Sequence, residues 1–196
     1  MPRTAGSQAP SMLKDSLYNL DPGPDSPRIV RMIVETPRGS SNKCEYDSQT
    51  RIFRLDRPLY SPMHYPAEYG FIPGTIAEDG DPLDVLCLIE YPTFTGCLIE
   101  VRPIGMLDLI DQTTTDQKLI ATPVNDPRYA RVQTIEDLPQ HVMREIEYFF
   151  TIYKELEEKV VETRGRRNQE HAFDRISASR RRYQDVFSLV EDKGKR

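Results

Sequence analysis

Short runs of alternating or continuous apolar residues fill the first two thirds of the chain, and this pattern predicts β-strands. The first run, residues 29–35, is rich in β-branched residues and ends just before Pro37. Between the apolar runs 85–90 and 97–109, the segment 91–96 contains a proline and a glycine and predicts a hairpin loop. The expected strands are residues 29–35, 43–47, 52–56, 85–90, 97–109 and 118–124.

The last third of the chain has apolar residues at helical spacing instead. A proline-containing helix start at 137–139 leads into a pattern that continues to residue 156, and a second helix is expected from about 168 to 189. Residues 58–82 are rich in proline and glycine and are expected to form a long, ordered loop. Strands followed by helices predict a small barrel or strongly curved sheet with the helices packed outside.

Composition limits the range of functions. The chain has 196 residues, 38% of them apolar, which is enough for one core and little for two. We therefore expect one domain at 28–190 between a flexible leader at 1–27 and a flexible tail at 191–196. No apolar stretch approaches the roughly 20 residues of a membrane span, and the net charge of −5 argues against a general nucleic-acid binder. Three cysteines without a Cys-x-x-Cys pair indicate reduced thiols and a cytoplasmic protein.

The most informative segment is acidic. Asp79, Asp81 and Asp84 lie within six residues, Gly80 and Pro82 fix the turn between them, and a strand follows. Like charges this close repel one another unless water or cations compensate them, and carboxylate oxygens suit Mg²⁺ or Mn²⁺. On spacing alone an acidic surface turn is an equally good interpretation. An EF-hand loop is disfavoured, because its glycine and its distal glutamate are not matched.

A second acidic group surrounds a polar loop after an apolar strand. It consists of Asp108, Asp111 and Asp116, and Lys118 follows at once. If both acidic loops lie at one end of a barrel, the convergent carboxylates could hold several divalent cations, the usual arrangement for attack at phosphorus. Taken alone, these aspartates are ordinary loop residues. The chain lacks the phosphate-binding loop G-x-x-x-x-G-K-[ST] and the nucleophile elbow G-x-S-x-G.

At these residues the chain resembles the soluble family I inorganic pyrophosphatases. The family signature is matched by the run Asp79-Gly80-Asp81-Pro82-Leu83-Asp84-Val85. Further matches extend along the chain: Glu35, Lys43, Glu45, Arg57, the stretch 65–72, the D-x4-D-x-K spacing of Asp111, Asp116 and Lys118, and the F-F-x-x-Y-K stretch at 149–154.

The resemblance implies a mainly β fold with flanking helices: an OB-like, five-stranded closed β-barrel plus two C-terminal α-helices. It implies a cytoplasmic hydrolase that splits pyrophosphate into two orthophosphates, with several Mg²⁺ ions per active site and Mn²⁺ as a substitute. It also implies a homo-oligomer, and the chain length favours a hexamer over a dimer. The attacking group would be a water or hydroxide that bridges metal ions.

The same match assigns roles to individual residues. Asp81 would be the general base, since its acidic neighbours would bind metal. The expected metal ligands are Asp79, Asp84, Asp111, Asp116 and Glu35, with Glu45 just outside them. The expected ligands of the phosphate oxygens are Lys43, Arg57, Lys118, Lys154, Tyr69 and Tyr153.

A few positions depart from the family pattern. Glu68 stands where asparagine is common, Gln112 replaces a frequent acid, and 166–168 occupy a stretch in which many members have a tryptophan. Two other functions compete with hydrolysis. An OB-like barrel could bind oligonucleotides or oligosaccharides, which the acidic charge disfavours. An inactive relative could serve as a scaffold, which the complete set of expected catalytic positions disfavours.

Overall fold

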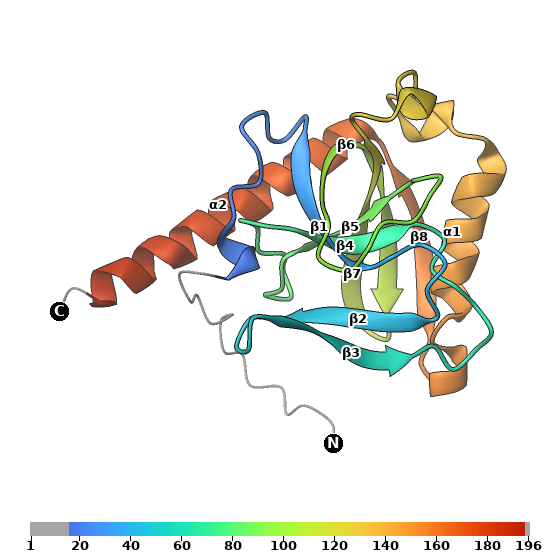
Figure 1. Ribbon diagram of the computed structural model, residues 1–196, viewed down its shortest axis with the longest axis horizontal. Coiled ribbons are helices and arrows are strands. Elements are labelled where there is room, and N and C mark those ends of the chain that lie inside the picture. Colours follow the sequence, from blue (N-terminus) through green and yellow to red (C-terminus); the bar gives the residue numbers. More distant parts are fainter. Residues whose placement is uncertain (1–15, 195–196) are drawn as a thin grey trace.

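The centre of the molecule is a closed ring of five strands (Figure 1). It is seen in a computed structural model that describes residues 16–194. In ring order the strands are β1 (Val30–Thr36), β4 (Glu68–Ile72), β5 (Leu83–Cys87), β7 (Thr114–Pro123) and β6 (Leu98–Asp111). The ring closes because the first half of β6 also pairs with β1. With the helices α1 (Gln140–Ile152) and α2 (Gln169–Gly194), this confirms the predicted five-stranded barrel with two C-terminal helices.

Three strands lie outside the ring. β2 (Asn42–Asp47) and β3 (Ile52–Pro58) form a separate antiparallel hairpin, drawn below the barrel in Figure 1. β8 (Val161–Arg167) pairs with the second half of β6. Single 3₁₀ turns complete the described chain: η1 (Leu17–Asn19), η2 (Pro127–Tyr129), η3 (Ile135–Asp137) and η4 (Glu155–Glu157).

Each helix covers a different apolar surface of the ring. Neighbouring residues of a strand point to opposite faces, so that Leu86 belongs to the cluster packed against α1 and Val85 to the cluster packed against α2. Phe149 and Phe150 anchor α1, while Ala172 and Ile176 anchor α2. In residues 16–194, no helix combines the length and the apolar character that crossing a membrane requires.

The long segment 58–82 differs from its prediction as a loop, because it contains β4. This strand packs closely against β1: a Cβ atom at Gly70 would lie 1.9 Å from the carbonyl oxygen of Ile33. Only glycine allows this approach without displacing the backbone. The strand is short and is flanked by prolines, which obscured its pattern in the sequence.

Three other details of the prediction need correction. The apolar runs around 91–96 do not form a hairpin with each other, since β5 pairs with β4 and, in parallel, with β7. β8 was not predicted, because only Val161 of its residues is buried and the rest are mostly charged or polar. The helix expected from 137–139 begins at Gln140 and ends at Ile152, where η4 follows after two residues.

Part of the predicted leader contacts the barrel. Ser16 is buried, and the ring of Tyr18 packs edge-on against Tyr46 and Phe71. Residues 1–15 of that leader lie outside the described residues, as do 195 and 196 of the predicted tail. The earlier part of the tail continues α2.

Candidate active site

The acidic loop between β4 and β5 is a closed turn. The amide of Ala77 donates a hydrogen bond of 2.7 Å to the carbonyl of Asp81, and the amide of Asp81 donates one of 3.1 Å to the Asp79 carboxylate. Gly80 sits between the two aspartates with φ of +94°, a conformation that side chains other than glycine's rarely adopt. The turn presents Asp79 and Asp81 at the start of β5.

A buried lysine joins the two acidic loops. The Nζ atom of Lys118, on β7, contacts the carboxylate of Asp84 on the adjacent β5 and lies 2.6 Å from that of Asp116. The hydroxyl of Tyr69 donates a hydrogen bond of 2.8 Å to the same Asp84 carboxylate. Asp79, Asp84 and Asp116 line one pocket. For these three aspartates, the two acidic loops therefore come together at one end of the barrel, as the metal-site hypothesis requires.

The carboxylates repel one another. Partial desolvation raises the pKa of Asp79, and the negative charges of Asp84 and Asp116 add to this effect. Burial alone would lower the pKa of Lys118, but the two carboxylates beside it raise that pKa above its ordinary value. The ammonium group therefore stays charged and offsets part of the repulsion.

Glu35 is the most perturbed acid of the site. It lies at the end of β1 and is buried, and its carboxylate accepts a hydrogen bond of 2.8 Å from the amide of Tyr46. Burial, with smaller contributions from Asp84 and Glu45, raises the pKa of Glu35 to about 8. A carboxyl group with this pKa is neutral at pH 7 unless a positive charge approaches it.

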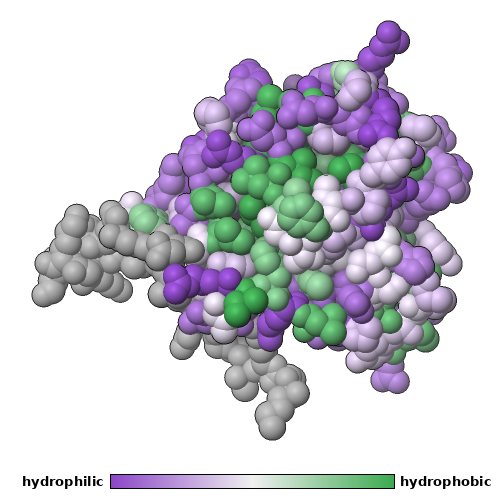
Figure 2. All heavy atoms as spheres, viewed as in Figure 1, coloured by the Kyte–Doolittle hydropathy of each residue, from purple (hydrophilic) through white to green (hydrophobic). Residues whose placement is uncertain are grey.

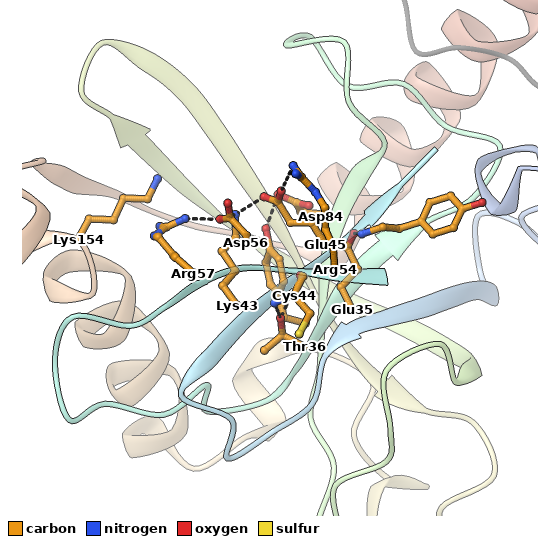
Figure 3. A network of polar contacts seen from close by, with 12 residues as sticks. Glu35, Thr36, Lys43, Cys44, Glu45, Arg54, Asp56, Arg57, Asp84 and Lys154 are labelled. Atoms are coloured by element: carbon orange, nitrogen blue, oxygen red, sulfur yellow. Dashed lines mark hydrogen bonds and ion pairs between the residues drawn. The ribbon is translucent and has the colours of Figure 1, made fainter. Parts of the chain in front are cut away.

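The β2–β3 hairpin carries a network of charges along one side of the site (Figure 3). The Lys43 ammonium lies 2.6 Å from the Glu45 carboxylate and 3.4 Å from that of Asp56. Asp56 also accepts a hydrogen bond of 2.5 Å from Arg57. Lys43 and Arg57 are partners in the strand register, which brings the two cations to the same edge.

The end of α1 closes the site from the other side. Tyr153 is buried, and the charges that act on its hydroxyl are those of Lys118, Lys43, Asp116 and Asp111, so it lies near the second acidic loop and the hairpin. Lys154 contacts the Asp111 carboxylate at the end of β6.

The donor chemistry of the site fits hard divalent cations. Glu35, Asp79, Asp84, Asp111 and Asp116 supply oxygen ligands, and one oxygen of Asp111 is buried with no hydrogen-bond partner among the residues that the structure describes. Within residues 16–194, no three potential ligands are already arranged around one ion. Lysines hold these carboxylates instead: Lys118 bridges Asp84 and Asp116, and Lys154 holds Asp111. Cation binding would have to draw the carboxylates away from these lysines.

One predicted acid lies elsewhere. Asp108 accepts hydrogen bonds from Arg167 and Gln117 and lines a separate groove beside α2. Asp81 itself is exposed at the mouth of the acidic turn.

Sequence reasoning missed Asp56 and Glu157, which both hold Arg57. Asp56 could have been noticed, because it precedes the arginine on an alternating strand. Glu157 is 100 residues away and gave no signal.

Comparison with known proteins agrees with this geometry. Residues 32–184 match the sequence profile of the inorganic pyrophosphatase family. The inorganic pyrophosphatase of Halalkalibacterium halodurans is 48% identical over 157 residues, which cover 80% of this chain and 96% of that protein. That of Geobacillus stearothermophilus is 53% identical over 135 residues, covering 69% of this chain and 82% of that protein.

A solved structure has the same fold. The crystal structure of the inorganic pyrophosphatase from Thermus thermophilus superposes with a TM-score of 0.84 at 42% identity, covering 86% of this chain and 99% of that one. The family match spans the barrel strands β4 to β7, α1 and both acidic loops. This chain therefore belongs to the soluble family I inorganic pyrophosphatases, enzymes that hydrolyse pyrophosphate to two orthophosphates.

Proposed function

We propose that this chain hydrolyses pyrophosphate with Mg²⁺ bound by its convergent acidic loops. The observation that carries the proposal is the meeting of Asp79, Asp84 and Asp116 at one pocket, with Lys118 between two of them. Desolvation and, to a smaller extent, the negative charges of Asp84 and Asp116 raise the pKa of Asp79, and bound cations would counteract both effects. The substrate and the products are polyanions, which an acidic protein would repel unless cations were bound between them.

The proposed metal ligands are the carboxylates that face the pocket or approach it. Bound Mg²⁺ lowers the pKa of water and neutralises phosphate charge, and Mn²⁺ is expected to substitute. Glu35 would become ionised on cation binding, because the cation counteracts the burial that raises its pKa. Glu45 supports this region by holding Lys43. The proposed ligands are Asp79, Asp84, Asp111, Asp116 and Glu35.

Asp81 is the proposed general base. It lies on the same turn as Asp79 and is exposed, so that it could accept a proton from the attacking water and pass that proton to solvent. Asp84 is less exposed and is held by Tyr69 and Lys118. The environment thus distinguishes two carboxylates of one motif.

The phosphate oxygens are proposed to bind the basic and hydroxyl groups around the pocket. Lys118 and Lys154 each hold an acid of the site and would exchange that partner for cation-bound substrate. Lys43 and Arg57 approach from the β2–β3 hairpin. The proposed set is Lys43, Arg57, Lys118, Lys154, Tyr69 and Tyr153.

The assembly is proposed to be a homo-oligomer, with a hexamer favoured over a dimer, in the cytoplasm. Figure 2 shows apolar residues gathered in the middle of one face of the molecule. Large exposed apolar side chains include Tyr91 and Phe94, which are 70% and 68% exposed.

The three free cysteines suit a reducing compartment, which supports the proposed cytoplasmic location. A particle mass in solution, measured by light scattering, of six times the chain mass of 22.6 kDa would support the hexamer.

A phosphate-release assay tests the proposal. Purified protein with pyrophosphate and Mg²⁺ is expected to release two phosphates per substrate, to lose this activity with excess chelator and to regain part of it with Mn²⁺. Rapid release that persists in chelator would reject the metal assignment. Absence of release under all conditions, from folded protein, would favour a scaffold or binding role.

A further inference from the structure

Arg57 is held at its far side by an acid that lies outside the pocket. Its Nε atom donates a hydrogen bond of 2.7 Å to Oε1 of Glu157, in the η4 turn. The Glu157 side chain is only 7% exposed and that of Arg57 is 18% exposed, so water competes weakly for this ion pair. The second oxygen of Glu157 accepts a hydrogen bond of 3.1 Å from Lys159, which fixes the direction of the carboxylate.

The remaining nitrogens of the guanidinium differ from one another. Nη1 donates to Asp56, as Figure 3 shows. Nη2 is buried and has no acceptor among residues 16–194. Two carboxylates on different elements therefore fix the plane of the guanidinium, and among residues 16–194 no acceptor occupies its buried Nη2. This is the geometry that makes arginine suited to planar recognition of phosphate.

The pair also joins two parts of the site that lie far apart in the sequence. Arg57 lies on the β2–β3 hairpin, which is not part of the barrel. Glu157 follows Tyr153 and Lys154 by a few residues, and a hydrogen bond of 3.2 Å from the Lys159 amide to the Lys154 carbonyl closes that turn. The contact thus ties the hairpin to the segment that carries two further proposed substrate ligands.

We propose that Glu157 is a positioning residue for pyrophosphate hydrolysis: it orients Arg57 toward the substrate and sets the distance between the hairpin and the end of α1. This inference rests on the proposed role of Arg57 in substrate binding. Among residues 16–194, the side chain of Glu157 pairs with Arg57 and Lys159 and with no residue of the acidic loops. Its removal should therefore act only through Arg57.

The test is a double-mutant cycle with steady-state kinetics and Mg²⁺ present. E157A is expected to lower kcat/KM by about 10- to 100-fold, since small displacements of a binding group have effects of this order. Its changes in kcat and in KM should have the same direction as those of R57A. When Arg57 is already replaced by alanine, adding E157A should lower kcat/KM by less than about twofold further. E157Q, which keeps the acceptor without the charge, should fall between E157A and the wild type.

The control is E155Q, an exposed acid on the same turn, which is expected to retain activity within about twofold. If E157A does not fold, as judged by circular dichroism, E157Q takes its place in the cycle. Equal losses from the Glu157 substitution with and without Arg57, or unchanged kinetics in the folded variant, would overturn the inference. If R57A alone retained full activity, the proposed role of Arg57 would fail first.

Discussion

At the scale of single residues, the surroundings of two acids that are close in sequence can give them different chemical properties. Asp81 is exposed at the tip of the acidic turn, whereas Asp84 accepts hydrogen bonds from Tyr69 and Lys118. The D-G-D-P-L-D motif located these acids in the sequence. It could not reveal which cation holds which acid, because Lys118 reaches Asp84 from a neighbouring strand and Lys154 reaches Asp111 from the end of α1.

The first prediction concerns Asp81. Replacing it with asparagine removes the proposed proton acceptor but keeps the shape of the turn, since the amide hydrogen bond of the turn goes to Asp79. General acid–base catalysis contributes roughly 10²–10⁴-fold, so we expect kcat to fall by about this amount. Pyrophosphate turnover measured at saturating Mg²⁺ provides the value, and the melting temperature should remain within a few degrees. Undiminished turnover in a folded variant would remove the assignment.

A second prediction concerns Glu68, the departure from the usual asparagine. Its side chain is fully buried; one oxygen accepts a hydrogen bond of 2.7 Å from the Thr93 amide, and the other has no hydrogen-bond partner in the described part of the chain. Burial raises the pKa of Glu68 above its ordinary value. A raised pKa in the fold favours the neutral form, so its contribution to stability is present below the unfolded pKa and is lost as pH rises through the folded pKa.

E68Q mimics the neutral form at every pH. Its melting temperature relative to the wild type should therefore increase as the pH rises above the ordinary glutamate pKa of about 4.3. Differential scanning calorimetry across this range measures the difference, and E90Q, at an exposed position, serves as the control. A difference that does not change with pH would show that Glu68 has the same pKa in the folded and unfolded chain.

At the scale of elements, the periodic patterns identified most of the fold. The strands near 29–35, 43–47, 52–56 and 118–124, and both helices, lie close to where they were expected. β4 and β8 were missed for different physical reasons. β4 is buried on both faces and therefore does not alternate, while β8 is stabilised by pairing with β6 and has almost no apolar residues of its own.

The β2–β3 hairpin depends on a small aromatic contact. An isolated two-stranded hairpin is marginally stable, and this one rests on the barrel through Tyr46, whose ring contacts Tyr18, Phe53 and Phe71. The Tyr46 hydroxyl also accepts a hydrogen bond of 3.1 Å from the Leu17 amide. Residues before the barrel therefore help to seat the hairpin that carries Lys43 and Arg57.

A third prediction follows for Tyr46. Substitution with alanine removes a buried ring and should destabilise the protein by about 3–5 kcal/mol, the usual cost for large aromatic residues. Urea unfolding gives the free energy. Y46F, which keeps the ring and loses only the hydroxyl, should cost about 1 kcal/mol. A loss for Y46A as small as that for Y46F would mean that the hairpin is held by other contacts.

At the scale of the whole molecule, ring closure creates the site. The acidic turn precedes β5, and Asp116 and Lys118 lie at the start of β7, which pairs with β5 in parallel. The parallel pairing places both starts at one end of the barrel, although more than 30 residues separate Asp84 from Asp116. From the sequence, the meeting of the two loops could only be assumed, because hydrophobic periodicity predicts strands but not their order in the sheet.

The measurement that tests the account most directly is Mg²⁺ binding without turnover, by isothermal titration calorimetry. The wild type is compared with D79N, D84N and D116N, and with D174N, an exposed acid on α2. If the two loops form one cation site, each of the first three substitutions should weaken the same binding event by about tenfold or more, while D174N leaves it unchanged. Binding that survives unaltered in all three folded variants would contradict a shared site.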